Sequence, residues 1–515
     1  METKQKNHFT SFFQNRYFHI YVLIAIILVA IFFRFYNIPF RYGLGDEEVR
    51  EAIIGIEGAR QLQAPMTGGF SSAGSFTWGP WFYYQMIIVS LLFPYLYSPW
   101  IYLDITSVVC VIVMYKIGEE LEGKNFGLLL ALFCALSPAF IISATHLTFP
   151  DLTNIFAVVA FFLFTKIAKK DISYWWSFIF GIVLGIAINI HYQMTGLLIL
   201  PVILLVYKYK KFLYFVFTSI GITLTFIPLL LWDLTNHWHN FRNILYYYQY
   251  GKNAIYVPNS WTIYLRDFWP SYWADVLGVP QIIASIIMIL FVFVAGWMIV
   301  KKKISKPTML ILAAFMFNFI LLRYYWGEKF FGYLNYLRPF VIIATCFTIW
   351  TLYAIAHKSK YPYTKYLVVI GVIVLILFIL PRSIERLNKD PFTMNIYRQV
   401  AIIQKKFPNK KFTVYICASP GKSTDTAEAK STIFLFDLSK RLSSNGKKLG
   451  VYGRYCLPPK IIALNNASSS AMIRDTSFFD FSKASDSALT KAYWKPYSFG
   501  AIYDSTTRWW FKEQP

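Results

Sequence analysis

Two acidic motifs could supply the carboxylates of an enzyme. Asp46 and Glu47 lie in RYGLGDEEVREAIIGIEGARQLQ (41–63), and Asp151 lies in SATHLTFPDLT (143–153). A carboxylate at a membrane–water boundary could act as a general base that takes a proton from an acceptor hydroxyl. Two carboxylates in one cavity would provide a base and a second group that binds a donor or a metal. Each position also suits a helix N-cap, so a purely structural role stays open.

Basic and polar side chains elsewhere could bind a phosphate or a sugar. The loop YYWGEKFFGYLNYLRP (324–339) contains Lys329 and Arg338. A guanidinium at the outer end of a membrane helix is well placed to pair with a phosphate, although such side chains also reach lipid headgroups. His191 and Gln193 lie in a short turn between two apolar segments, where they could contact substrate or make structural hydrogen bonds.

Other catalytic motifs are absent from the sequence. His237 and His239 are not expected to bind a metal, because a spacing of two does not place both on one helix face and no third ligand is evident. The chain has no Walker A run, no G-x-S-x-G elbow, no H-E-x-x-H and no C-x-x-C motif. An enzyme of this design would draw on a lipid-borne substrate rather than on a cytosolic nucleotide.

The composition indicates a protein with many membrane-spanning helices. Of the 515 residues, 57% are hydrophobic and 15% are charged, and the mean hydropathy is +0.46. Soluble domains average about 45–50% apolar and about 25% charged residues. The net charge of +24 fits basic cytoplasmic loops, and no basic run accompanies a recognisable nucleic-acid-binding motif, so we expect no nucleic-acid partner.

Eleven apolar segments are predicted to span the membrane. Basic residues precede the first segment and no small-residue cleavage site follows it, so we expect an uncleaved anchor with a cytoplasmic N-terminus. The predicted spans are 18–36, 98–117, 124–142, 152–168, 173–190, 194–207, 212–232, 280–300, 307–323, 335–356 and 364–381.

The stretch PWFYYQMIIVSLLFPYLY (80–97) is ambiguous, and loop charge decides its placement. If it does not span, the basic loops 166–170, 207–211, 301–306 and 357–365 all lie in the cytoplasm, as the positive-inside rule requires. If it spanned, all four loops would lie outside. We therefore predict an interfacial or re-entrant helix, which places both acidic motifs on the outer side.

The segment after Asp46 has the pattern of an amphipathic helix on the membrane surface. Its apolar residues recur at helical spacing: Val49, Ala52, Ile53, Ile56 and Ala59. Four charged residues are predicted to lie mostly off that face: Glu48, Glu51, Glu57 and Arg60. The following stretch GGFSSAGSFTWGPW (68–81) is either a flexible surface loop or a mobile element over the site.

The chain divides into two parts. Residues 1–381 form the membrane domain, with long outer loops at 37–97 and 233–279. An odd number of spans places residues 382–515 outside the membrane. Short strand-like runs alternate there with helix-like periods, which predicts a small α/β domain. The strand-like runs are 412–417, 432–436 and 499–504.

The order of these features resembles the GT-C glycosyltransferases that use polyprenyl-phosphate sugars, such as the protein O-mannosyltransferases and the aminoarabinose lipid A transferases. The resemblance begins with one N-terminal span followed by Asp46-Glu47. It continues through WGPWFYYQM (78–86), KIGEELEGKNFGLLLALFCALSPAFIISATHLTFPD (116–151) and GIAINIHYQMTGLLILPVILL (185–205). It is specific over residues 18–210, and 210–381 agree in general layout.

The resemblance implies an all-α membrane domain of about eleven helices and an inverting transfer of a sugar from a polyprenyl-phosphate donor to a lipid, glycan or protein acceptor. The enzyme would work in the cell envelope, in the plasma membrane of a prokaryote, with the active site and C-terminus outside the cytoplasm. Asp46 would be the general base, Glu47 would support it, and Asp151 would help shape the donor site.

The resemblance also assigns groups to the donor phosphate and the substrates. Lys329 or Arg338 would stabilise the departing polyprenyl phosphate. His191, Gln193 and His146 would contact substrate; His146 lies where an arginine often precedes the second acid. The scheme requires no metal, and a divalent metal is compatible with it.

Two other classes of function stay open at this stage. A lipid or glycan flippase would need charged residues along a path through the spans, but the span interiors contain few, with Asp104 a main exception. A non-catalytic scaffold that presents the C-terminal domain is the second alternative. Substitution of Asp46 by Asn separates an enzyme from a scaffold, because only the enzyme loses an activity.

Overall fold

A computed structural model describes residues 17–69, 71, 76–250, 261–325, 329–361, 363–394 and 397, without the side chain of Asp46. Beyond residue 397 it describes only the backbone of five short strands.

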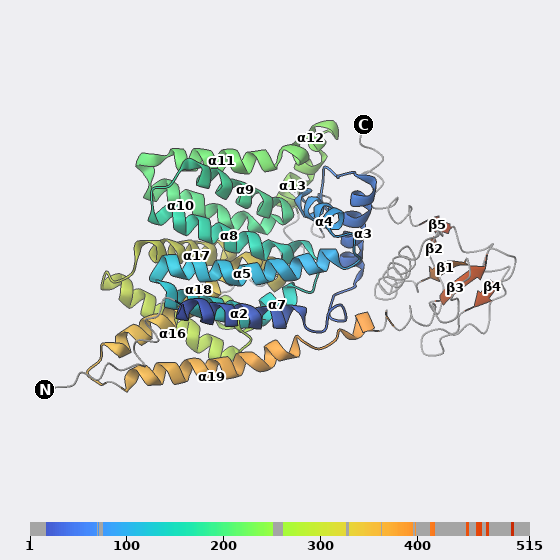
Figure 1. The fold of residues 1–515 in the computed structure, drawn as a ribbon. Coiled ribbons are helices and arrows are strands. Elements are labelled where there is room, and N and C mark those ends of the chain that lie inside the picture. The colour runs from blue at the N-terminus through green and yellow to red at the C-terminus, as the bar shows by residue number, and fades with distance from the viewer. Residues whose placement is uncertain are drawn as a thin grey trace.

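The membrane part is a bundle of helices (Figure 1). Its first half contains α2 (Phe18–Phe35), α3 (Asp46–Gln61), α4 (Trp81–Leu92), α5 (Ser98–Glu122), α6 (Lys124–Leu136), α7 (Pro138–Ser143), α8 (Phe149–Lys169), α9 (Tyr174–Ile190), η1 (Tyr192–Leu198), α10 (Ile199–Tyr207) and η2 (Tyr209–Lys211). Its second half contains α11 (Leu213–Thr225), α12 (Ile227–Thr235), α13 (His239–Tyr250), α14 (Trp261–Ile263), η4 (Tyr264–Phe268), α15 (Trp269–Leu277), α16 (Gln281–Val300), α17 (Lys306–Tyr324), η5 (Phe331–Leu337), α18 (Arg338–His357) and α19 (Thr364–Glu385).

All eleven predicted spans coincide with helices, and the protein is a multi-pass membrane protein. Among the described residues, seven helices are long and apolar enough to cross a membrane, and α11 with α12, bent by 49°, would make an eighth. The helices α6, α9 and the combined η1–α10 are apolar but shorter. The count of eleven spans therefore stays a prediction.

The helix α4 fits the predicted interfacial element. It has 12 residues, about 18 Å of helix, whereas a membrane core is about 30 Å thick. It packs against α3, and Figure 1 shows both at one end of the bundle, away from the N-terminus. By contrast, α8 has 21 residues and runs from Asp151 in its first turn to Lys169 in its last turn. Its acidic and basic ends are thus about 30 Å apart.

Small residues bring α9 and α11 into close contact. A Cβ atom at Gly181 would lie 2.0 Å from the carbonyl oxygen of Thr218, and one at Gly221 would lie 2.4 Å from that of Phe178. Glycines four residues apart, here Gly181 and Gly185, allow such backbone approach between membrane helices. This packing fixes the C-terminal end of α9. The turn that follows α9 contains candidate site residues.

The C-terminal part contains paired strands. They are β1 (Phe412–Cys417), β2 (Gly450–Tyr452), β3 (Lys460–Asn465), β4 (Ser470–Met472) and β5 (Pro496–Ser498). β1, β3 and β4 form an antiparallel sheet in that order, and β2 pairs with β5. β1 coincides with the predicted run 412–417; the runs 432–436 and 499–504 lie outside the described residues. The α/β class of this domain and its boundary at 381 stay predictions.

Candidate active site

The two acidic motifs lie side by side, although about a hundred residues separate them. The backbone N–H of Gly43 donates a 2.9 Å hydrogen bond to the carbonyl of Thr145. A Cβ atom at Gly43 would lie 2.7 Å from Glu48 Oε1 and 3.0 Å from His146 Cδ2. The loop that leads to α3 and the loop that leads to α8 are therefore in direct contact. This contact fits the prediction that both acidic motifs lie on the same side of the membrane.

The start of α3 presents a carboxyl group that titrates near neutral pH. Gly45 is the N-cap and Asp46 is the first residue of the helix. The side chain of Glu47 is 52% exposed. Incomplete hydration at the crowded helix start raises its pKa to about 7, and the negative charge of Glu51 adds to the rise. A carboxyl group with such a pKa can exchange protons at physiological pH.

The prediction that Glu51 and Glu57 lie on the polar face of α3 is wrong, because both carboxylates are buried. Arg50 donates from Nε to Glu51 Oε1 at 2.8 Å, and a second bond from its Nη2 reaches the same oxygen. Arg60 pairs with Glu57 at 2.7 Å. A buried carboxylate is tolerated where a cation neutralises it. α4 covers the side of α3 that the sequence pattern assigns to water.

Asp151 lies in the first turn of α8, where it accepts hydrogen bonds from two elements. Thr148 Oγ1 donates to Asp151 Oδ2 at 2.6 Å, and Asn335 Nδ2 lies 3.4 Å from Asp151 Oδ1. The N-cap of α8 is Thr148. Neither Asp151 nor Asp46 is therefore the N-cap that the structural alternative assumes; both occupy the first turn of their helix.

Arg338 is buried close to the start of α8. Its Nη1 donates to the carbonyl of Ala139 at 3.1 Å, to Ser143 Oγ, and more weakly to Asn154 Oδ1 at 3.4 Å. All three partners are neutral, and no carboxylate of the described residues forms an ion pair with Arg338. A buried guanidinium without an anionic partner leaves positive charge in this region, which an anion would stabilise.

Lys329 lies before Arg338, in the connection between α17 and α18. Its ammonium donates to the carbonyl of Tyr325 at 2.7 Å, and the residue is 8% exposed. Burial lowers the pKa of Lys329, and the positive charge of Arg323 lowers it further. Lys329 therefore belongs to the connection between α17 and α18, whereas Arg338 is the first residue of α18.

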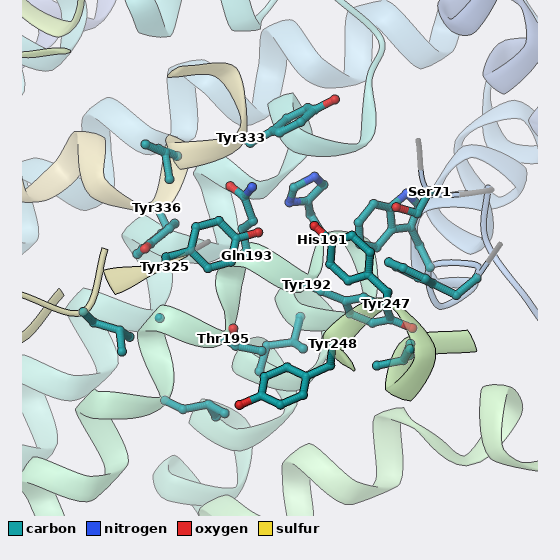
Figure 2. Close-up of a pocket in the computed structure, with 18 of the residues that line it drawn as sticks. Ser71, His191, Tyr192, Gln193, Thr195, Tyr247, Tyr248, Tyr325, Tyr333 and Tyr336 are labelled. Carbon is teal, nitrogen blue, oxygen red and sulfur yellow. The ribbon is translucent and has the colours of Figure 1, made fainter. Parts of the chain in front are cut away.

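Next to these groups is a cavity of about 690 Å³, here called the tyrosine pocket. Its lining includes Ser71, Phe76, Trp78, Ile188, His191, Tyr192, Gln193, Thr195, Gly196, Leu198, Ile222, Phe226, Ile244, Tyr247, Tyr248, Leu321, Leu322, Tyr325, Tyr333, Leu334 and Tyr336. Figure 2 shows tyrosines from several segments around the cavity. No Asp, Glu, Lys or Arg is among the described residues that line it. The predicted residues His191 and Gln193 belong to this pocket rather than to the acidic cluster.

His191 is an aromatic platform rather than an acid or base. Its ring stacks on Trp78 at 4.6 Å between centroids and lies 5.0 Å from the ring of Tyr333. Burial lowers the pKa of His191 to about 3. The imidazole is therefore neutral at physiological pH, and its stacking can serve a flat or apolar ligand.

His146 lies at the acidic site and not at the tyrosine pocket. Its Nδ1 is 3.2 Å from both Thr145 Oγ1 and the carbonyl of Ile142. Part of the predicted mobile stretch 68–81 lies outside the described residues. Its described part contributes Ser71, Phe76 and Trp78 to the wall of the tyrosine pocket.

In the part of the chain that the structure describes, no three His, Cys, Asp or Glu side chains are grouped so that they could hold a metal ion. The side chain of Asp46 is outside that part.

Comparison with solved structures identifies the fold. No protein-family model and no curated protein matches the sequence. The chain nevertheless has the GT-C fold, which it shares with solved structures of ArnT and of the oligosaccharyltransferase AglB. ArnT from Cupriavidus metallidurans bound to undecaprenyl phosphate matches with a TM-score of 0.54 and 12% identity, over 85% of this chain and 93% of that one.

Two structures from Archaeoglobus fulgidus match similarly. The oligosaccharyltransferase AglB in complex with an inhibitory peptide and a dolichol-phosphate has a TM-score of 0.54 at 12% identity, covering 86% of this chain and 70% of that one. The apo oligosaccharyltransferase has a TM-score of 0.55 at 12% identity, covering 82% of this chain. This match spans 64% of the length of the archaeal enzyme.

Proposed function

We propose that the protein is a membrane glycosyltransferase that moves a sugar from a polyprenyl phosphate to an acceptor hydroxyl or amide outside the cytoplasm. The observation that carries this proposal is the joining of the two acidic motifs by the Gly43–Thr145 hydrogen bond, beside a large uncharged cavity. An enzyme that uses a lipid-borne sugar needs both features: a carboxylate for the acceptor and an apolar site for the carrier.

The tyrosine pocket suits an isoprenoid chain. Burial of apolar surface drives such binding. The described lining contains no Asp, Glu, Lys or Arg, and His191 is neutral at physiological pH. The fold matches that bind undecaprenyl phosphate or dolichol-phosphate support this class of donor. They do not identify the sugar.

Two cations serve the phosphate of the carrier. Lys329 donates to Tyr325, which lines the tyrosine pocket, so its charge is at the pocket edge. Arg338 lies beside the first turns of α8 and has no anionic partner among the described residues. Positive charge placed where negative charge accumulates on the leaving group lowers the barrier to transfer.

In the proposed reaction, the acceptor oxygen or nitrogen forms a bond to the anomeric carbon while the bond from that carbon to the phosphate oxygen breaks. The acceptor proton passes to the carboxylate of Asp46, Glu47 supports it electrostatically, and polyprenyl phosphate leaves with the bonding electron pair. Attack opposite the leaving group inverts the anomeric centre. Asp151 shapes the donor site, and His191 and Gln193 contact the carrier; His146 lies near the acceptor.

The orientation of the protein in the membrane follows from the positions of its basic loops. Lys169, at the far end of α8 from Asp151, belongs to the basic loops, and Lys208 and Lys211 of a neighbouring turn pair with Asp171. The positive-inside rule assigns these turns to the cytoplasm. The acidic site and residues 382–515 then lie outside the cytoplasm. Residues 1–381 form the transferase domain, which lies in the plasma membrane of a prokaryote.

The test is sugar transfer by the purified protein in lipid vesicles, with a panel of labelled polyprenyl-phosphate sugars and of lipid, glycan and peptide acceptors. Release of polyprenyl phosphate is measured for the parent and for Asp46→Asn. Loss of a general base costs about 10²–10⁴-fold, and we expect kcat to fall by that factor.

Glu120→Gln is the matched control, because Glu120 pairs with Lys169 at the opposite end of the bundle. It should keep the parent rate. Equal rates for the parent and Asp46→Asn would remove Asp46 from its role. No release with any combination of donor and acceptor would overturn the proposed function, and carrier movement between leaflets without release would indicate a flippase.

A further inference from the structure

The short helix η5 touches the tyrosine pocket and the acidic site with neighbouring residues. Leu334 and Tyr336 line the pocket, whereas the residue between them, Asn335, reaches the first turn of α8. Tyr272 donates to the carbonyl of Leu334 at 2.6 Å and holds η5 from its other side. η5 is therefore the element that separates the uncharged cavity from the second acidic motif.

Asn335 is the polar connection between these two regions. Its side chain is fully buried, and its Nδ2 donates to the carbonyl of Pro150 at 2.6 Å and more weakly to Asp151 Oδ1 at 3.4 Å. Its Oδ1 accepts no hydrogen bond from the described residues. A buried amide with this geometry fixes the backbone immediately before Asp151 and one oxygen of its carboxylate.

Arg338 reinforces the connection one turn later. Its Nη1 lies 3.4 Å from Asn154 Oδ1, and Asn154 in turn donates to the backbone carbonyl of Asp151 at 2.9 Å. The segment 335–338 thus contacts the first two turns of α8 at two places. A displacement of η5 would be transmitted to Asp151 through Asn335.

We propose that Asn335 is a positioning residue that aligns Asp151 with a lipid chain occupying the tyrosine pocket. This inference rests on the proposed function for the nature of the occupant. A chain in the pocket packs against Leu334 and Tyr336, sets the position of η5, and so orders the first turn of α8. An empty pocket leaves that turn less constrained, which ties the geometry of the donor site to carrier binding.

The kinetic test compares Asn335→Ala with the matched variant Asn318→Ala. Asn318 is also a fully buried asparagine; it donates to Ala314 of its own helix at 3.0 Å and does not contact Asp151. A misplacement of about 1 Å costs about 10²-fold in rate. We expect kcat of Asn335→Ala to fall by about 10- to 100-fold with the KM for the lipid donor within about threefold.

The variant Asn318→Ala should keep the parent kcat, and its loss of thermal stability should be similar to that of Asn335→Ala. Equal kcat losses for the two variants would show a structural role for Asn335 and overturn the proposal. A rise in KM without a fall in kcat would place Asn335 in carrier binding, and would overturn it as well.

Asn335→Asp supplies a pH test. The ionised carboxylate cannot donate to Asp151 and repels it, whereas the protonated carboxyl can donate one hydrogen bond. The ratio of the Asn335→Asp rate to the parent rate should therefore rise as pH falls. A ratio that does not change with pH would contradict an alignment by hydrogen bonding.

Hydrogen–deuterium exchange tests the proposal without sugar transfer. Addition of undecaprenyl phosphate to the parent in detergent should protect backbone amides of residues 151–155, whereas Asn335→Ala should bind the lipid and lose this protection. Lipid binding without protection in the parent would overturn the inference even if transfer is observed. Protection in the parent without any transfer would support the inference and reject the proposed reaction.

Discussion

The backbone N–H of Gly43 donates a 2.9 Å hydrogen bond to the carbonyl of Thr145 and joins two loops that each lead to an acidic helix start. This single bond lies between main-chain atoms, so no side-chain type specifies it. What the sequence must supply is the absence of a side chain at residue 43, because Glu48 and His146 occupy the space around its Cα atom.

Substitution of Gly43 by Val should separate the two loops. The new side chain would overlap Glu48 Oε1 and His146, and overpacking of this kind costs about 1–3 kcal/mol. We expect a lower unfolding temperature and at least tenfold slower transfer, measured by thermal denaturation in detergent and by polyprenyl phosphate release. Gly296→Val is the control, because a Cβ atom at Gly296 meets nothing within 4 Å. Parent-like behaviour of Gly43→Val would show that the loops do not need to touch.

Glu47 should impose a pH dependence on both stability and rate. Its folded-state pKa of about 7 is above the ordinary value of 4.5, so the folded state binds the proton more tightly than the unfolded state does. The stabilisation is complete below about pH 4.5 and is lost as pH rises through 7. Glu47→Gln should remove this loss, which is measured as the unfolding temperature between pH 4.5 and 8.

The rate should change in the opposite direction. If the ionised carboxylate of Glu47 supports the base, kcat of the parent rises with pH through about 7, and this rise is missing in Glu47→Gln. A pH–rate profile of Glu47→Gln with the same midpoint as the parent would assign that midpoint to another group.

His191 should contribute aromatic surface and no charge. With a pKa of about 3, it stays neutral across pH 5–8 and adds no ionisation to the rate profile in that range. His191→Phe keeps a ring against Trp78 and should bind undecaprenyl phosphate within about threefold of the parent, whereas His191→Ala should bind about tenfold more weakly, as loss of aromatic contacts worth about 1.5 kcal/mol implies. Quenching of tryptophan fluorescence on titration with the lipid measures both. A His191→Phe protein as weak as His191→Ala would indicate a specific hydrogen bond instead of stacking.

The helices and the shared placement of the acids could be predicted because both depend on local patterns. Apolar length predicts α2, and loop charge together with helix direction puts Asp46 and Asp151 at one end. The placement of α4 at the membrane interface stays a prediction that rests on the same argument, since only a non-spanning α4 brings every basic loop to one side.

The buried face of α3 and the tyrosine pocket could not be predicted in this way. The burial of Glu51 depends on α4, which covers α3. The helical periodicity of α3 cannot show that a neighbouring helix covers its polar face as well. The pocket combines Trp78, Tyr247 and Tyr333, which are far apart in the chain and individually typical of the aromatic belts of membrane proteins. The role of Asn335 requires its distance to Pro150, and Asn335 itself does not stand out in the sequence.

The segment after α19 should stabilise the loop that precedes Asp46. The hydroxyl of Thr393, which is fully buried, donates to the carbonyl of Tyr42 at 2.6 Å, and the N–H of Asp390 donates to the carbonyl of Phe40 at 2.9 Å. Thr393→Val keeps the shape of the side chain but leaves the carbonyl of Tyr42 without this donor. A buried acceptor that loses its partner costs about 1–3 kcal/mol.

We therefore expect Thr393→Val to lower the unfolding temperature and to speed proteolysis within residues 36–45, measured by mass spectrometry of the cleavage products. Thr223→Val is the control, because Thr223 is exposed and its hydroxyl bonds only to Ser219 of its own helix among the described residues. Faster cleavage confined to the neighbourhood of Thr393 would show that the segment does not restrain the loop before Asp46. Cleavage at 36–45 with a matching fall in kcat would show that the connection to the C-terminal domain helps to hold Asp46, the proposed general base, in place.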